Sequence, residues 1–148
     1  MTMEINSTLA VSASALRAER MRLDTIASNL ANANTTRTAE GGPYKRRAVV
    51  FEAETFDSPF ADTLATLGQE ARPQGVAVTD VIEDQTPPRL VYEPGHPDAN
   101  AEGYVAYPNV NPVLEVVDLM AATRAYEANV QVISATKRLA DAALSIGA

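Results

Sequence analysis

Apolar residues recur at every seventh position near the start of the chain. Leu9, Leu16, Leu23 and Leu30 form this row, and Ile26 lies one helical turn before Leu30. No glycine or proline interrupts residues 1–34, and most of the charged residues fall on other faces of a helical wheel. Such heptad spacing is typical of an amphipathic helix that packs against another helix. We therefore predict a long N-terminal helix within residues 1–34.

A second heptad row occupies the end of the chain. Its members are Leu119, Tyr126, Ile133 and Ala140, flanked by Val116, Val130 and Leu144. Asn111 followed by Pro112 predicts the helix start, because asparagine caps a free N–H group and proline at the first position loses no hydrogen bond. An alanine-rich row beginning at Leu114 gives this helix a second apolar face, which indicates contact with more than one neighbour.

The pattern changes between the helices, where eight of the nine prolines and six of the seven glycines lie. Short runs of β-branched and aromatic residues predict strands at 44–51, 75–82 and 89–92, with a weaker fourth at 103–107. Segment 52–73 contains mostly acidic charges and is predicted to be an exposed loop or short helix. The Pro87-Pro88 pair predicts a turn.

The predicted fold is mainly α with a small β region. It comprises an N-terminal helical region (1–34), a β-rich middle region (35–111) and a C-terminal helical region (112–148). We expect the terminal helices to pair as an antiparallel coiled coil that leaves its outer faces free for other subunits. Contacts between unlike faces that do not close into a ring build a helical filament, so these patterns indicate an assembly subunit.

Composition narrows the function further. Aromatic residues make up only 5 % of the chain and tryptophan is absent, which favours an apolar core shared between subunits. The net charge of −7 argues against nucleic acid, and we interpret the basic run 45–47 as a solvated strand edge. The absence of cysteine excludes disulfides and thiolate metal sites. No run of ~20 apolar residues predicts a membrane span, and the first residues lack the pattern of a cleaved signal peptide.

Two stretches resemble the flagellar axial proteins, the family of rod, hook and hook-associated subunits. Residues 26–35 (IASNLANANT) resemble the N-terminal signature that all members share. Residues 94–112 (PGHPDANAEGYVAYPNVNP) and 124–130 (RAYEANV) are similar to proximal rod subunits, and so is 43–51 (PYKRRAVVF). A different proximal rod subunit is the nearest alternative within this family, and the YPNVNP run speaks against it.

The resemblance implies a structural role. Members leave the cell unfolded through the flagellar type III export apparatus, without a cleaved signal peptide, and assemble in the periplasm. There they form the drive shaft that joins the membrane ring to the distal rod and hook. The expected partners are the chain itself, other proximal rod proteins, the rod-to-ring junction protein and the membrane ring. No enzyme activity, cofactor, metal, nucleic acid or membrane span is expected.

The predicted interface residues follow from the two heptad rows and the family motif. Asn29 and Asn129 are expected to form interface hydrogen bonds that fix helix register, and Asn32 either does the same or caps its helix. The full set is Leu9, Leu16, Leu23, Ile26, Asn29, Leu30, Asn32, Val116, Leu119, Met120, Tyr126, Asn129, Val130 and Ile133. Phe56 and Phe60 resemble a short motif that engages the export gate, although both rings also suit simple packing of the loop.

Other classes of function have little support in the sequence. Glu93, His96 and Asp98 are the one cluster that suggests a small periplasmic enzyme, through a metal or an acid–base pair. Their position around Pro-Gly-His-Pro favours a structural turn. Cleavage of peptidoglycan needs two carboxylates in a cleft, and the β region is too small to form one. A membrane-active translocator would need larger apolar faces with basic flanks.

Overall fold

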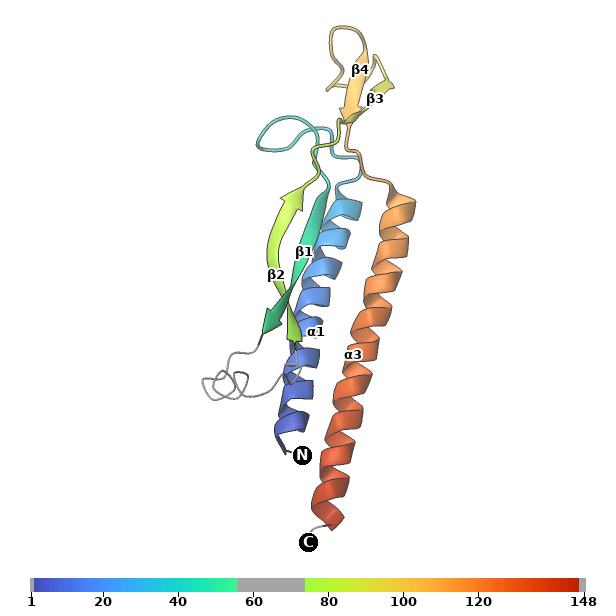
Figure 1. Ribbon diagram of the computed structural model, residues 1–148. Helices are drawn as coiled ribbons and strands as arrows, with labels where there is room; N and C mark the ends of the chain where they lie inside the picture. Colours follow the sequence, from blue (N-terminus) through green and yellow to red (C-terminus); the bar gives the residue numbers. More distant parts are fainter. Residues whose placement is uncertain (1, 56–73, 147–148) are drawn as a thin grey trace. The chain divides into compact units, whose positions relative to one another are not determined.

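Figure 1 shows the computed structural model of the chain, which describes residues 2–55 and 74–146. Helices α1 (Thr2–Ala31) and α3 (Pro112–Ile146) lie at the two ends of the described chain. Between them come strands β1 (Arg47–Thr55), β2 (Gln74–Glu83), β3 (Arg89–Tyr92) and β4 (Tyr104–Tyr107). The fold is therefore mainly α-helical with a small β region, as the sequence predicts. The motif predicted at Phe56 and Phe60 lies outside the described residues.

The chain divides into two compact units, and both helices run through both of them. Unit 1 combines Met1–Arg20, Phe51–Thr79 and Arg124–Ala148. Unit 2 combines Met21–Val50 and Asp80–Thr123. Each unit therefore contains a segment of α1, a segment of α3 and part of the β region.

Local hydrogen bonds define both helix ends in unit 2. At the start of α3, the Asn111 side chain accepts hydrogen bonds from the backbone N–H groups of Val113 (3.0 Å) and Leu114 (3.5 Å). This confirms Asn111 as the N-cap. After α1, Asn32 donates from Nδ2 to the Ser28 carbonyl (2.9 Å) and accepts a bond from the Thr35 hydroxyl (3.1 Å). Asn32 thus terminates its helix through local bonds.

The strands form two separate two-stranded sheets, β1 with β2 and β3 with β4. The arrows of β1 and β2 point in opposite directions in Figure 1. Strands β3 and β4 are antiparallel, with Leu90 opposite Ala106 and Tyr92 opposite Tyr104. The predicted bounds of β3 are confirmed. Strand β1 starts three residues later than predicted and runs through four residues that the sequence assigned to the loop.

The late start of β1 has a physical cause in the preceding loop. The backbone N–H of Tyr44 donates to the carbonyl of Thr35 (3.0 Å) rather than to a neighbouring strand. Two other polar groups of this segment, the backbone N–H and C=O of Arg47, bond to a side chain of α1. Tyr44 therefore belongs to a tertiary contact, whereas the carbonyl of Arg46 still accepts a bond from the backbone N–H of Asp84 (2.7 Å), the residue after β2.

The two units have different interiors. In unit 2 the buried side chains include Ile26, Tyr44 and Val105, together with the polar residues Asn29 and Glu115. Among the described residues of unit 1 the buried side chains are small, namely Ser12, Ser14, Ala18 and Thr136. Ser14 connects α1 to strand β2, since its hydroxyl accepts a hydrogen bond from the Val76 backbone N–H (3.0 Å). The fully buried positions among the described residues of unit 1 therefore contribute little apolar burial.

Neither helix in the described part of the chain has the length of apolar sequence that crossing a bilayer requires.

Candidate functional site

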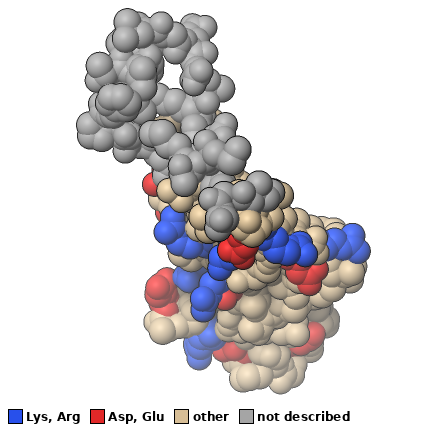
Figure 2. Space-filling view, turned by 90° about the horizontal axis from the view of Figure 1, so that it is seen from below, with Lys and Arg blue, Asp and Glu red and all other residues tan. Residues whose placement is uncertain are grey.

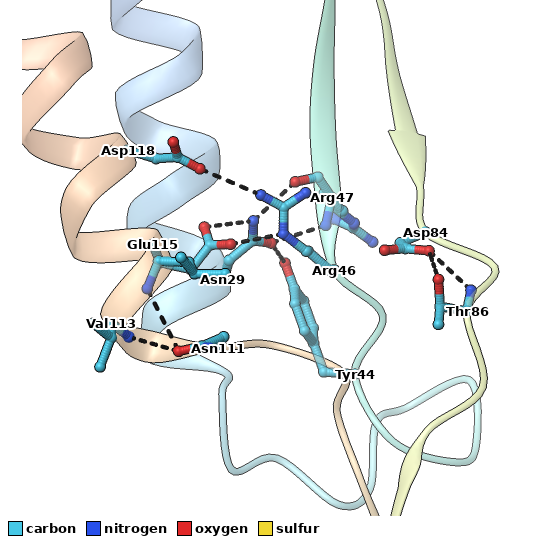
Figure 3. Close-up of polar contacts among 11 residues, drawn as sticks. Asn29, Tyr44, Arg46, Arg47, Asp84, Thr86, Asn111, Val113, Glu115 and Asp118 are labelled. Carbon is cyan, nitrogen blue, oxygen red and sulfur yellow. Dashed lines mark hydrogen bonds and ion pairs between the residues drawn. The ribbon is translucent and has the colours of Figure 1, made fainter.

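Asn29 of α1 lies at the centre of a buried polar network in unit 2 (Figure 3). Its side chain is 0 % exposed. The Nδ2 group donates to the Arg47 carbonyl (2.8 Å) and to Oε2 of Glu115 (3.1 Å). The Oδ1 atom accepts from the Tyr44 hydroxyl (2.9 Å) and from the Arg47 backbone N–H (2.9 Å). Both donors and both acceptor sites of the amide are therefore used.

Glu115 contributes a carboxylate from the first turns of α3 to the same network. It is 1 % exposed, and Oε1 accepts a hydrogen bond from Nε of Arg46 at 2.7 Å. The second guanidinium contact of Arg46 is an ion pair with the half-exposed Asp118 at 3.7 Å. A buried carboxylate is tolerated only when it is paired and hydrogen-bonded, and both oxygens of Glu115 meet this condition. Its position near the N-terminus of α3 adds a favourable helix-dipole interaction.

Tyr44 and Arg47 complete the network from the segment before β1. The buried Tyr44 ring lies 5.9 Å from the Arg47 guanidinium carbon, which is within cation–π range. The Arg47 side chain also reaches Glu83 at the end of β2 (3.2 Å). Hence α1, α3 and β1 are connected by charged and amide groups whose partners are specific. A connected network of this kind fixes the relative register of the elements that carry it.

The basic run 45–47 was predicted to be a solvated strand edge, and for Arg46 this interpretation is wrong. Arg46 instead pairs with the buried Glu115, because that carboxylate needs a cation once α3 packs in unit 2. Lys45 and Arg47 are exposed, as predicted, and both pair with Glu83 at the surface. The sequence signal for Arg46 was weak, since the two partners are separated by 69 residues.

Helix α3 has an unusual distribution of buried and exposed residues in unit 2. Its buried positions are Glu115 and Ala122, which lie seven residues apart on one face. Val113, Val117 and Met120 follow a spacing of four and three residues, so they share the opposite face. They are 71 %, 57 % and 53 % exposed, and Leu114 and Val116 beside them are exposed as well. We call Val113, Val117 and Met120 the outer stripe.

The predicted interface residues lie in three environments. Ile26 and Asn29 are buried within the chain. Val116, Met120 and Val130 are exposed. The remaining members are half-buried, namely Leu9, Leu16, Leu23, Leu30, Asn32, Leu119, Tyr126, Asn129 and Ile133. Asn129 donates to the Ala125 carbonyl of its own helix (2.9 Å). A role of these residues between subunits stays a prediction.

Glu93, His96 and Asp98 have separate structural partners in unit 2. The Glu93 carboxylate accepts a bond from the Tyr107 hydroxyl (3.1 Å), and this bond raises the pKa of Tyr107 above its usual 10.0. Nδ1 of His96 accepts from the backbone N–H of Asp98 (3.1 Å). Asp98 in turn accepts from the Thr36 hydroxyl (2.8 Å) and pairs with Arg37 (3.5 Å). These contacts stabilise a turn, as the sequence favoured.

Within the described residues, no three His, Cys, Asp or Glu side chains are grouped so that they could hold a metal ion. On the face of the molecule in Figure 2, basic and acidic side chains are interspersed among uncharged residues. The described residues on that face therefore show no continuous basic patch of the kind that nucleic acid binding requires.

Two family models match this chain at its two helical ends. The model described as "Flagella basal body rod protein" matches residues 9–37. The model described as "Flagellar basal body rod FlgEFG protein C-terminal" matches residues 101–146. The two matched ranges include Asn29 and Glu115, which the buried network joins.

Several curated relatives match almost the whole chain, and all are called flagellar basal-body rod protein FlgC. The relative from Bacillus subtilis is 47 % identical over 94 % of this chain and 95 % of its own length. The one from Borreliella burgdorferi is 40 % identical, covering 97 % and 98 %. The one from Escherichia coli O157:H7 is 44 % identical and covers 93 % of both. The chain therefore belongs to the FlgC family of flagellar basal-body rod proteins and is a structural subunit rather than an enzyme.

Proposed function

We propose that this subunit polymerises through its terminal helices into the proximal part of the flagellar rod. In this proposal the rod acts as a drive shaft between the membrane ring and the distal rod and hook. Its neighbours are further copies of the chain, other proximal rod proteins, the rod-to-ring junction protein and the membrane ring. The rod lies in the periplasm, and the chain arrives there through the flagellar type III export apparatus.

The outer stripe of α3 is the observation that carries this proposal. A helix of a self-contained domain places its large apolar residues inside, but α3 buries Glu115 and Ala122 and exposes Val113, Val117 and Met120. Exposed apolar surface of this kind marks a protein contact. Burying the three side chains in an assembly removes them from water, at roughly 1.5 to 3 kcal/mol for each fully buried side chain.

The terminal helices are proposed to pair as an antiparallel coiled coil in the assembled rod. The half-buried heptad residues of α1, such as Leu16 and Leu23, and those of α3, such as Tyr126 and Ile133, support this part of the proposal. Their remaining exposed surface is available to neighbouring subunits. In this arrangement each helix contributes to packing within one chain and to packing between chains.

Deletion of the gene followed by electron microscopy of isolated basal structures tests the proposal. We expect rings without a rod and non-motile cells, both restored by the intact gene. Normal rods in the deletion strain would contradict the proposed role, provided that no second gene of this family is present in the strain.

A point variant tests the role of the outer stripe without removing the rest of the chain. Val117→Asp places a carboxylate in the outer stripe, where burial in an assembly would leave it unpaired. We expect normal folding of the purified chain and loss of the chain from basal structures. Asn109→Asp is the matched control, because Asn109 is exposed two residues before the α3 cap and lies outside the stripe. Equal incorporation of both variants would contradict the assembly role of the stripe.

A further inference from the structure

The β3–β4 hairpin presents a second exposed apolar surface in unit 2. Strand pairing places Leu90, Tyr92 and Tyr104 on one face of the hairpin. Leu90 and Tyr92 are each 63 % exposed, and Tyr104 is exposed as well. The opposite face contains Val105, which is fully buried. We call Leu90, Tyr92 and Tyr104 the hairpin patch.

Contacts within the hairpin restrain two of the three side chains of the hairpin patch. The rings of Tyr92 and Tyr104 pack edge to face, with centroids 5.3 Å apart. Tyr92 also packs directly on Gly103, where an added Cβ would lie 2.8 Å from ring atom Cε2. The missing Cβ of Gly103 permits this close approach, and glycine also tolerates the positive φ of 82° found at this position. Rigid, exposed tyrosines are typical anchors of protein interfaces because they lose little conformational entropy on binding.

We infer that the hairpin patch of one subunit docks on the outer stripe of α3 in a second copy of this chain. The inference rests on the proposed polymerisation and adds to it the two surfaces that meet. An open helical assembly needs two different, mutually complementary surfaces on every subunit. Unit 2 presents two apolar surfaces of different shape, a flat aromatic face and a helical ridge.

Charge at the edges of the two surfaces is complementary. Arg124 lies one turn beyond Met120 on the same face of α3 and is exposed. Glu102 is exposed in the turn that leads into Tyr104. Neither side chain has an ion-pair partner among the residues that the structure describes. Docking of the hairpin patch on the outer stripe therefore places a carboxylate and a guanidinium at the rim of one contact, which favours the pairing of unlike surfaces over like ones.

Disulfide trapping in assembled basal structures tests this contact, and the absence of native cysteines makes it specific. The test variant is Tyr92→Cys with Met120→Cys in one chain. After mild oxidation we expect a ladder of disulfide-linked multimers of this chain. Tyr92→Cys with Arg138→Cys is the matched control, because Arg138 is an exposed α3 residue far from the outer stripe along the helix. The control should stay monomeric under the same oxidation.

Other outcomes of the trapping experiment are equally decisive. Linkage of Tyr92→Cys to a different basal-body protein, or the same ladder in the control, would overturn the inference. So would absence of linkage in rods that contain the doubly substituted chain, although the proposed function would then still stand. Absence of the wild-type chain from rods would instead contradict the proposed function itself.

A charge exchange gives a second, independent readout. Glu102→Arg and Arg124→Glu each bring like charges together, and each should lower incorporation into rods by about two- to fivefold, the scale of a rim ion pair. The chain with both substitutions should recover most of this loss. Additive losses in the double variant would show that these two residues do not meet and would overturn the proposed docking.

Discussion

Asn29, Arg46 and Glu115 show how desolvation and hydrogen bonding balance at the scale of single residues. Burial of a carboxylate costs several kcal/mol unless charged or polar donors compensate it. Here the compensation comes from an α1 amide and from a guanidinium in the segment before β1. Each group is therefore stabilising only in the presence of the others, and removal of one leaves buried polar atoms without partners.

Arg46→Gln is predicted to be far more destabilising than Arg47→Gln. The first substitution leaves the buried carboxylate of Glu115 without its cation, at a cost of about 2 to 4 kcal/mol because Arg46 itself is partly exposed. The second removes an exposed ion pair with Glu83 and the cation–π contact with Tyr44, and should cost about 1 kcal/mol. Urea unfolding of the purified chains, followed by circular dichroism, measures both. Similar midpoints for the two variants would contradict the role assigned to Arg46.

Sequence reasoning could not find this network, for reasons that lie in the residues themselves. Asn29 and Glu115 are separated by 86 positions, so no local spacing links them. Glu115 at a helix start is explained equally well by the helix dipole, and a run of three basic residues is usually solvated. Asn29 was predicted to form interface hydrogen bonds, and the structure shows its amide bonded to Glu115 of the same chain, so a role of Asn29 between subunits stays a prediction.

At the scale of helices and strands, specific contacts fix the conformation of the turns between strands. The carbonyl of Gly103 accepts a hydrogen bond from the backbone N–H of Glu93 (2.9 Å). Because Gly103 has no Cβ, the Tyr92 ring can pack directly against its backbone. The turn after β2 is closed by Asp84, whose carboxylate accepts bonds from both the hydroxyl and the backbone N–H of Thr86. Each turn gives a measurable prediction.

Gly103→Ala is predicted to destabilise the β3–β4 hairpin. The added methyl group requires both a left-handed backbone and displacement of the Tyr92 ring, which together should cost about 2 kcal/mol. Gly42→Ala shares the positive φ but meets no atom within 4 Å, so it should cost only about 1 kcal/mol. Gly95→Ala has neither problem and serves as the neutral control. Amide hydrogen exchange in the hairpin should be faster in Gly103→Ala than in the Gly42→Ala and Gly95→Ala chains, and equal protection in all would contradict the tight packing.

Asp84 is predicted to titrate below its ordinary value. The Thr86 hydroxyl, followed by the Thr86 backbone N–H, holds the pKa of Asp84 below 3.8. A lowered folded-state pKa means that the contribution of this turn to stability is present above pH 3.8 and is lost as pH falls through the folded value. In Thr86→Ala the pKa should rise towards 3.8, as measured by NMR titration of the Asp84 carboxyl carbon. Thr79→Ala should leave it unchanged, and an unchanged value in Thr86→Ala would refute the assignment.

At this scale the sequence was more informative than for single residues. The Asn111-Pro112 pair predicted the start of α3 correctly, because capping is a local interaction. The same holds for β3, because Pro87-Pro88 precedes it and Pro94 follows it closely. The start of β1 was misplaced because Tyr44 and Arg47 bond to α1 and its following loop, and such a contact has no local signature.

For the whole molecule, the central feature is that apolar residues lie on the outside of α3 in unit 2 while polar and small residues lie inside. A heptad pattern shows which residues share an apolar face of a helix. It does not show which of two apolar faces packs within the chain and which packs against another subunit. In α3 the half-buried row with Leu119, Tyr126 and Ile133 and the exposed outer stripe lie on different faces. In the proposed assembly the half-buried row packs within the chain and the outer stripe packs against a neighbouring subunit.

Leu23→Asp and Ile133→Asp are predicted to block incorporation into the rod without blocking export. Each places a carboxylate in a half-buried heptad position that packing in the assembly would desolvate. The measurement compares the amount of the chain in isolated basal structures with the amount that leaves the cytoplasm. Asp24→Asn, a substitution at an exposed neighbour of Leu23, is the control. Normal motility of either aspartate variant would remove the case for that heptad row.

The most direct test of the assembly proposal is electron cryomicroscopy of native basal structures at a resolution that shows side chains. Our account predicts that Val113, Val117 and Met120 of each copy are buried against a neighbouring subunit in the rod. A rod in which these three side chains face solvent would contradict assembly through the outer stripe of α3.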